Sequence, residues 1–311
     1  MSNIDTINKL TIHNFSKIWM RNYLRALDLC LKGKNLYLIN QNSLDWKKIS
    51  MVFTGASPIL EEEVEDLIQE RSRFFLLSSD TSAYFLYKKK ILPDAILSID
   101  SGRGTAYHFR EDLPESIPII TWLGGNTEIF LKKNPIYIYL SSFPLDQILA
   151  LYLKEALILK NSGLNIATLA LSMAEEFDCL DFSLAGVSFL SYKGKSHCRG
   201  TGYEMYKSPQ INRKSPLESY FPGYYRGTLS NKNKNSLAVL QKSRYGTQSF
   251  KNMSDSIAKQ FTLMKNQNLP LEILRKFIQS LQSGEIHKEL SEILGLTDSV
   301  MNRYIKNLQS F

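Results

Sequence analysis

Three short apolar runs lie in the first third of the chain, and each one ends in small or acidic residues. The first, MVFT, leads into Gly55. The second, residues 74–77, ends at a Ser-Asp-Thr turn that contains Asp80, and the third, residues 95–99, ends at Asp100. Short apolar runs bounded by turn residues are typical of buried parallel strands, whose carboxyl ends share the ligand-binding edge of an open α/β sheet. The pattern therefore predicts a catalytic or nucleotide-binding domain.

The remaining hydrophobic pattern extends this unit on both sides. Apolar residues spaced three and four positions apart predict a helix between Phe15 and Leu31, and Gly33 stands where that helix would end. Further strands are expected at 36–39, 118–122, 136–140 and 182–184, with helices at 145–160 and from 162 onward. Strands that alternate with helices are typical of an α/β fold with a mostly parallel sheet flanked by helices.

The pattern changes after residue 204. Residues 206–235 are rich in Pro, Ser, Asn, Lys and Tyr and predict a long loop, and helical spacing resumes from about residue 254. We therefore expect four parts along the chain. They are a helical lead-in at 1–45, an α/β core at 46–204, a basic linker at 205–253 and a helical extension at 254–311.

Charge is distributed unevenly along the chain. The 311 residues carry a formal net charge of +8. From Ser188 onward there are 19 Lys and Arg against 8 Asp and Glu, which leaves 19 against 22 in the first 187 residues. A basic surplus suits an anionic ligand such as a nucleotide-sugar, and it also suits nucleic acid or a membrane surface. A solvated basic face is the alternative that involves no ligand.

Composition restricts the class of protein further. Hydrophobic residues make up 43% of the sequence, enough for a large core, which argues against a disordered chain. No apolar run approaches the roughly 18 residues that a membrane span needs, and the polar start lacks a signal-peptide core, so we expect a cytoplasmic protein. The cysteines Cys30, Cys179 and Cys198 lack metal-ligand spacing, so we expect neither a metal site nor a disulfide framework.

Candidate ligand-binding groups follow the predicted strands. After the first strand, a loop of small residues precedes an acidic helix, so backbone N–H groups and a positive helix end converge where an anion would bind. Asp80 and Asp100 recur at equivalent strand ends, which favours ligand binding over turn chemistry alone. Small residues around Asn165 would let a ligand approach the backbone, and tight packing of a helix on the sheet is the alternative.

His197 is the candidate for acid-base chemistry. It lies in a Gly-rich basic loop after the predicted strand at 182–184, so a doubly wound sheet would place it near the same crevice as the other polar groups. Imidazole is the side chain best suited to proton transfer near neutral pH. A structural or merely exposed histidine is the alternative.

Four segments together resemble the core of a known family. They are GASP with its acidic helix, SSDTSAYFLYKKKILPDAILSID, SGLNIATLALSMAEEF and AGVSFLSYKGKSHCRGTGYE, in that order and spacing. They are similar to the bacterial motility accessory factors, flagellin glycosyltransferases that share a domain with the archaeal-type 6-hydroxymethylpterin diphosphokinases. The resemblance covers about residues 15–204, and WMRN, which ends at Asn22, also fits the helix that precedes the core in this family.

The resemblance implies a Rossmann-like domain that transfers a nonulosonic acid from a CMP-activated donor to a hydroxyl acceptor on a protein or a surface glycan, with no resident cofactor. Matched by position, the residues expected to bind the donor are Gly55, Ala56, Ser57, Pro58, Asp80, Asp94, Asp100 and Asn165. Thr81 and Thr168, which lie beside them, are expected to bind it as well. His197 matches the family histidine and is the expected catalytic residue. It would accept the proton of the acceptor hydroxyl or, as a cation, stabilise the departing phosphate.

Two positions differ from the family pattern. Ser57 replaces the second glycine of the nucleotide loop, which would keep a phosphate farther from the backbone unless the serine hydroxyl donates a hydrogen bond to it. Ser188 stands where the family usually has Asp, so a carboxylate is missing there. These replacements leave a non-catalytic binding protein open as an alternative.

Two other functions remain open from the sequence. Diphosphoryl transfer from ATP to a pterin alcohol would require Mg²⁺, for which Asp80 and Asp100 are the candidate ligands. The last residues have the spacing of a DNA-binding helix-turn-helix, with a turn at Gly295 and the basic side chains of Arg303 and Lys306 on the second helix. We favour a helical bundle that caps the enzyme or mediates self-association over DNA binding, because one weak turn motif is poor evidence for it.

Overall fold

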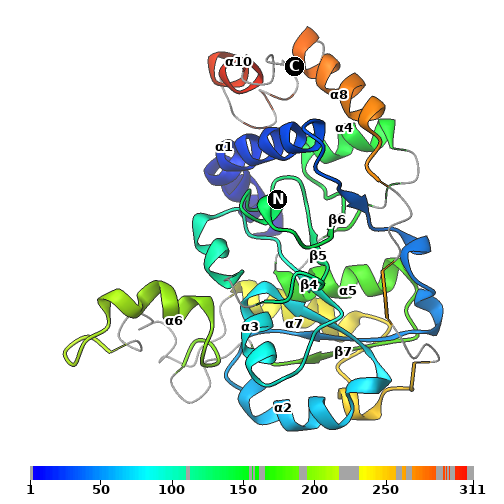
Figure 1. The fold of residues 1–311 in the computed structure, drawn as a ribbon, viewed down its shortest axis with the longest axis vertical. Coiled ribbons are helices and arrows are strands. Elements are labelled where there is room, and N and C mark those ends of the chain that lie inside the picture. Colours follow the sequence, from blue (N-terminus) through cyan, green and yellow to red (C-terminus); the bar gives the residue numbers. More distant parts are fainter. Residues whose placement is uncertain are drawn as a thin grey trace.

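The computed structural model shows one parallel sheet flanked by helices (Figure 1). It describes residues 3–109, 113–153, 156, 158–160, 165–188, 195–216, 231–256, 261–263, 268–284, 290, 292, 294 and 298–306. Within these residues seven strands pair in the order β1-β6-β5-β4-β3-β2-β7, and every pairing is parallel. The strands are β1 (Tyr37–Leu38), β2 (Ser50–Thr54), β3 (Phe75–Ser79), β4 (Ala95–Leu97), β5 (Ile119–Thr121), β6 (Ile136–Ile138) and β7 (Asp181–Ala185). The predicted α/β, Rossmann-like fold is confirmed.

The helices surround this sheet. They are α1 (Asn3–Leu31), α2 (Leu60–Gln69), α3 (Asp80–Lys88), α4 (Pro144–Tyr152), α5 (Ile166–Glu176), α6 (Gly202–Lys207), α7 (Asn231–Lys242), α8 (Leu271–Ser283) and α10 (Asp298–Lys306). A short 3-10 helix, η4 (Arg103–His108), follows β4. The helix predicted at 145–160 ends earlier, at Tyr152, and Ile158 forms a bridge beside Leu140.

Continuous apolar runs form the central strands because both faces of the sheet are covered. Val52 in β2 lies beside Leu76 in β3, and both side chains are fully buried. The expected edge strand at 36–39 is also present as β1, which pairs with β6. No helix of the described residues combines the length and the apolar character needed to cross a membrane.

The strand order reverses at β2. The strands β3 to β6 follow one another on one side of it, whereas β7 pairs on its other side. A reversal of this kind normally opens a crevice beyond the carboxyl ends of the two strands, and open α/β proteins bind their ligands there. The loops after β2 and β7 meet at this point.

The C-terminal helices share the core of the α/β unit. α8 packs against α1 and α4, and α10 packs against α1 and α8 (Figure 1). The ring of Phe277 lies 6.4 Å from that of Tyr23, and the Tyr152 hydroxyl lies 2.8 Å from the Ser280 hydroxyl. The apolar face of α8 is therefore packed against other helices of the chain. Self-association through the C-terminal helices stays a prediction. The proposed turn at Gly295 lies outside the described residues.

The segment expected as a linker is partly helical. α7 lies within residues 205–253 and packs on α5, and its Leu240 is buried. The following stretch runs beside β7, where the Ser183 hydroxyl donates to the carbonyl of Gln248 at 2.6 Å. The Asn- and Lys-rich composition of residues 205–253 did not predict these contacts, because the buried side chains of this segment are few and widely spaced. Residues 217–230 of the expected loop lie outside the described part.

Candidate functional site

A cavity of about 1170 Å³ lies beyond the carboxyl ends of β4, β5 and β6. The loop after β4 supplies much of its wall, from Ile99 to His108. Trp122 follows β5, and Tyr139 and Phe143 follow β6. α1 and α6 contribute further side chains, so segments that are far apart in the sequence enclose one space.

One side of the cavity is aromatic. We name as the aromatic wall the rings of Phe15, Trp19, Trp122 and Phe143. Trp19 stands edge-on to both Trp122 and Phe143, with ring centroids 5.7 and 5.5 Å apart, and it stacks on Phe15 at 5.9 Å. These separations are those at which aromatic pairs attract one another. The wall is therefore a packed apolar surface suited to a flat ring.

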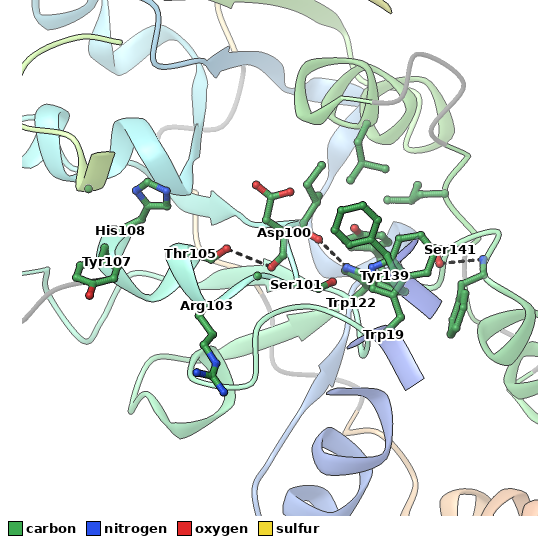
Figure 2. Close-up of a pocket in the computed structure, with 18 of the residues that line it drawn as sticks. Trp19, Asp100, Ser101, Arg103, Thr105, Tyr107, His108, Trp122, Tyr139 and Ser141 are labelled. Atoms are coloured by element: carbon green, nitrogen blue, oxygen red, sulfur yellow. Dashed lines mark hydrogen bonds between the residues drawn. The ribbon is translucent and has the colours of Figure 1, made fainter. Parts of the chain in front are cut away.

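The other side is polar and comes almost entirely from one loop. Asp100, Arg103, Thr105 and His108 line it, all within the segment that follows β4. In Figure 2, Asp100 and Thr105 lie between His108 and Tyr107 at one end and Trp19 and Trp122 at the other. The cavity thus offers a carboxylate, a guanidinium and an imidazole opposite an aromatic surface.

Hydrogen bonds fix the two sides relative to each other. The indole N–H of Trp122 donates to the carbonyl of Ile99 at 2.9 Å, and the Ser101 hydroxyl donates to the carbonyl of Gly124 at 2.6 Å. A Cβ at Gly124 would lie 2.4 Å from the Trp122 ring, so glycine allows this turn to fold over the indole. The loops after β4 and β5 are therefore tied together at the cavity.

A buried carboxyl group supports the wall that follows β6. Asp146, in the first turn of α4, accepts hydrogen bonds from the backbone N–H and the hydroxyl of Ser141, at 2.8 and 2.6 Å. Burial raises the pKa of Asp146 to about 7, although the hydrogen bonds from Ser141 act in the opposite direction. Ser141 lines the cavity, so this carboxyl group sets the position of a lining residue.

His108 is nearly buried at the polar end of the cavity, with 7% of its surface exposed. Its Nδ1 atom has no hydrogen-bond partner in the part of the chain that the structure describes. Burial lowers the pKa of His108, and the negative charge of Asp80 acts against that shift. Burial therefore favours the uncharged form of this imidazole at the polar end of the cavity.

His197 lies behind this residue rather than in the cavity wall. Its ring stacks on Tyr203 at 4.2 Å, and the Tyr203 ring lies 5.2 Å from that of His108. Burial, together with the neighbouring His108, lowers the pKa of His197 to about 4. Burial therefore favours the uncharged form of this imidazole. The catalytic role expected for His197 stays a prediction.

The predicted phosphate loop is filled by the protein's own chain. The N–H groups of Gly55 and Ser57 donate to the carbonyls of Ala185 and Gly186, at 2.9 and 2.8 Å. A Cβ at Gly55 would lie 2.6 Å from the Gly186 oxygen, so this glycine allows the two loops to approach each other. Pro58 precedes α2 in the same loop.

The segment that contains His197 also covers this loop. The backbone N–H of Cys198 donates to the carbonyl of Ala56 at 2.9 Å, and that of Arg199 donates to the Glu61 carboxylate at 2.8 Å. Lys195 forms an ion pair with the same carboxylate at 3.2 Å. The crevice at the strand reversal is therefore occupied, and the open cavity lies instead beyond β4 to β6.

Asp80 begins α3, where its carboxylate is enclosed by hydrogen bonds. One oxygen accepts from the Ser98 hydroxyl at 2.6 Å, and the other accepts from the N–H and the hydroxyl of Thr81, at 2.7 and 3.0 Å. With 5% of its surface exposed, Asp80 does not line the cavity. It acts on the cavity through its charge, which reaches His108.

Asp94 lies away from the other predicted residues. It precedes β4 and therefore sits at the amino edge of the sheet, opposite the cavity. Its carboxylate pairs with Arg71 at 2.8 Å and accepts from the N–H of Leu76 at 2.7 Å. The structure gives Asp94 a structural role, and the expectation that it adjoins the donor does not fit its place in the fold.

Asn165 and Thr168 form the N-terminal cap of α5. The Asn165 side chain accepts from the Thr168 N–H at 2.9 Å, and the Thr168 hydroxyl faces the Asn165 backbone in return. The Asn165 amide also donates to the hydroxyl of Ser236 in α7. Neither residue lines the cavity, whereas Leu169 of the same helix does.

Of the predicted site residues, all of which the structure describes, Asp100 lines the cavity and the others do not. The sequence reasoning missed Arg103, His108 and the aromatic wall. A signal for the first two was present, because the segment SGRGTAYHF directly follows the strand end at Asp100 and combines glycines with basic residues. The aromatic wall comes from three separated segments and had no local signal.

Comparison with known proteins agrees with this fold. A family model described as 6-hydroxymethylpterin diphosphokinase MptE-like matches residues 21–194. The structure of the MAf glycosyltransferase from Magnetospirillum magneticum AMB-1 is similar to the chain with a TM-score of 0.51 and 12% sequence identity. The similarity covers 94% of this chain and 61% of that one, so the chain spans less than two thirds of that protein. No curated protein matches the sequence.

Proposed function

The chain belongs to the 6-hydroxymethylpterin diphosphokinase MptE-like family and is similar in fold to a MAf glycosyltransferase, and from this premise we propose that it is a glycosyltransferase-like enzyme. It would transfer a nonulosonic, sialic-acid-like sugar from a CMP-activated donor to a hydroxyl acceptor on a protein or a surface glycan. The cavity that combines the aromatic wall with Asp100, Arg103 and His108 is the observation that supports this most.

The size and chemistry of the cavity suit a nucleotide-sugar. Ligand pockets typically enclose about 300–1,000 Å³, so a cavity of about 1170 Å³ can accommodate a large ligand. An aromatic surface stacks on a nucleobase, and each such contact contributes roughly 1–3 kcal/mol. Arg103 presents a planar, permanently charged group that matches phosphate geometry. The Asp100 carboxylate would accept hydrogen bonds from sugar or ribose hydroxyls.

Diphosphoryl transfer from ATP to a pterin alcohol is the second candidate, and the name of the family favours it. That reaction uses Mg²⁺ held by carboxylates. In the described part of the chain, no three His, Cys, Asp or Glu side chains lie close enough to hold a metal ion. Asp100 faces the cavity, but both Asp80 oxygens already accept hydrogen bonds. The two carboxylates therefore do not form a fitting pair of Mg²⁺ ligands.

Binding and turnover measurements separate the two candidates. The purified protein is titrated with CMP and with ATP by calorimetry, with and without EDTA. Release of CMP from CMP-N-acetylneuraminic acid and consumption of ATP with 6-hydroxymethylpterin are then followed under the same conditions. Our proposal predicts CMP binding and CMP release that persist in EDTA. Consumption of ATP that EDTA abolishes, without CMP binding, would support the kinase instead.

A further inference from the structure

We propose that His108, and not His197, is the residue that accepts the proton from the hydroxyl acceptor in this site. The inference rests on the proposed glycosyl transfer and adds to it the identity of the base. Four observations support it, namely the position of His108 in the cavity, its unpartnered nitrogen, the charge of Asp80 and the close packing of Gly202.

The first observation is position. His108 ends η4 and lines the cavity together with Asp100 and Arg103, which come from the same short segment. A general base must come within hydrogen-bond reach of the proton that it removes. His197 does not line the cavity. The ring of Tyr203, which does, stacks on His197 and also lies near the ring of His108. His108 therefore meets this requirement and His197 does not.

The second observation is an unsatisfied atom. The Nδ1 atom of His108 is buried, and within the described residues nothing forms a hydrogen bond with it. Buried polar atoms that lack a partner are rare in folded proteins. Nδ1 faces the backbone of Gly202, so the other ring nitrogen, Nε2, is the one that would accept the proton.

The third observation is electrostatic. Asp80 acts on His108 with a charge opposite to that of the protonated imidazole. Three hydrogen bonds hold its carboxylate in place, so this charge has a fixed position at the start of α3. The other groups that bear on His108 are the His197 imidazole and the Tyr203 ring. A fixed negative charge near the ring stabilises the imidazolium as it forms, without a hydrogen bond between the two side chains.

The fourth observation is steric. A Cβ on Gly202 would lie 2.4 Å from Nδ1 of His108 and 2.9 Å from the backbone of Tyr107. Only glycine lets α6 pack this closely on η4. The side chain of His108 is thereby confined between α6 and the cavity, as a base with a fixed orientation requires.

The chemical step balances with these groups. The acceptor oxygen forms a bond to the anomeric carbon of the sugar while the bond from that carbon to the phosphate oxygen breaks. The phosphate oxygen keeps the electron pair, and CMP departs. The proton of the acceptor hydroxyl moves to the neutral His108 imidazole and is then released to solvent or to the CMP phosphate. The negative charge of Asp80 stabilises the transient imidazolium.

Nuclear magnetic resonance of the four histidines tests the contact directly. The full-length protein is labelled with ¹⁵N-histidine, the imidazole signals are assigned with single histidine-to-glutamine variants, and CMP is added to saturation. We expect the His108 signals to move most. CMP that binds without moving them would overturn the role of His108 and leave the nucleotide site standing. Failure of CMP to bind would overturn the proposed function and the role of His108 together.

Kinetics with CMP-N-acetylneuraminic acid test the chemical role, with water as the acceptor. We expect His108→Ala to lower kcat by about 10²–10⁴-fold, the usual contribution of a general base, with KM within a few-fold of the wild type. Added imidazole should restore part of the rate, which a purely structural loss would not allow. His197→Ala is the matched control and should lose only a few-fold. If His108→Ala does not fold, His108→Gln gives the same comparison. A larger loss in His197→Ala would overturn the assignment.

Discussion

The side-chain amide of Asn22 donates a hydrogen bond of 2.8 Å to the backbone carbonyl of Gly125. The same amide donates to the carbonyl of Ser101 at 3.1 Å. One buried side chain of α1 therefore holds the loops after β4 and β5, which carry the polar side and part of the aromatic wall of the cavity. The N-terminal helix is thus part of the site, although it precedes the sheet in sequence.

Replacement of Asn22 by alanine should destabilise both the fold and the site. The carbonyls of Ser101 and Gly125 would lose a buried donor, and an unsatisfied buried group costs roughly 1–3 kcal/mol. We expect a loss of that order in the free energy of unfolding, measured with urea, and weaker CMP binding. Arg25→Ala changes an exposed side chain of the same helix and is the control. Unfolding midpoints that coincide for Asn22→Ala and Arg25→Ala would contradict this role.

The buried Asp146 predicts a specific dependence of stability on pH. Its pKa of about 7 in the folded protein lies above the ordinary value of 3.8. The folded state therefore holds a proton that the unfolded state has released, so the stabilisation is complete below about pH 4 and is lost as the pH rises to about 7. Asp146→Asn cannot ionise and should lack this slope.

The comparison is made as the difference in unfolding free energy between wild type and Asp146→Asn. As the pH rises from about 4 to about 7, the free energy of unfolding of the wild type should fall relative to that of the variant. The fall should be at most about 1.4 kcal/mol for each pH unit. Asp45→Asn, at an exposed ion pair with Lys48, serves as the control and should show no such trend. A difference that stays constant across this range would refute the buried titration.

Gly202→Ala should displace His108. The new Cβ would lie 2.4 Å from Nδ1, closer than any real contact of this kind, so the imidazole or α6 must shift. Overpacking of this kind typically costs about 1–3 kcal/mol. We expect altered His108 imidazole signals and slower CMP release from the sugar donor.

Gly200→Ala separates this contact from backbone strain. Gly200 has a positive φ of 78°, but a Cβ there would meet no atom within 4 Å. It should lose stability through strain and keep the His108 signals unchanged. Equal effects of the two variants on those signals would mean that the contact with His108 is not what Gly202 provides.

Arg103 should contribute to nucleotide binding through its charge. In the proposed complex the guanidinium pairs with the donor phosphate, and a charge-assisted hydrogen bond is worth roughly 1.5–3 kcal/mol. Arg103→Ala should therefore weaken CMP binding by about tenfold or more in calorimetry at low salt. Lys133→Ala removes a cation from an exposed surface pair with Glu115 and should leave the affinity unchanged. Equal affinities of Arg103→Ala and wild type would place the phosphate elsewhere.

The sheet was predictable because its strands are continuous apolar runs. Residues 74–77 and 95–99 gave the positions of β3 and β4, and the small residues after them marked the carboxyl edge. The positions of Asp80 and Asp100 near one edge follow from that alone. The motif around Asp94 suggested a place near the donor, but a residue that precedes a strand lies at the opposite edge of the sheet. Asp94 pairs there with Arg71.

The site itself depended on contacts that a linear pattern does not contain. Gly55 and Ser57 fit a phosphate loop by spacing, yet their N–H groups donate to the carbonyls of Ala185 and Gly186 at the end of β7, more than a hundred residues later in the chain. Trp19 and Trp122 meet only after α1 folds across the strand ends. The buried His108 could be found from the glycine-rich segment after Asp100, whereas its close packing on Gly202 required the tertiary structure.

A crystal structure of the protein with CMP bound tests the central claim most directly, which is that the cavity beyond β4 to β6 is the nucleotide-sugar site. The account predicts the cytosine ring against the aromatic wall, next to Trp122, and the phosphate at Arg103 within reach of His108. Electron density for CMP at the loop of residues 55–58, with the cavity empty, would contradict it.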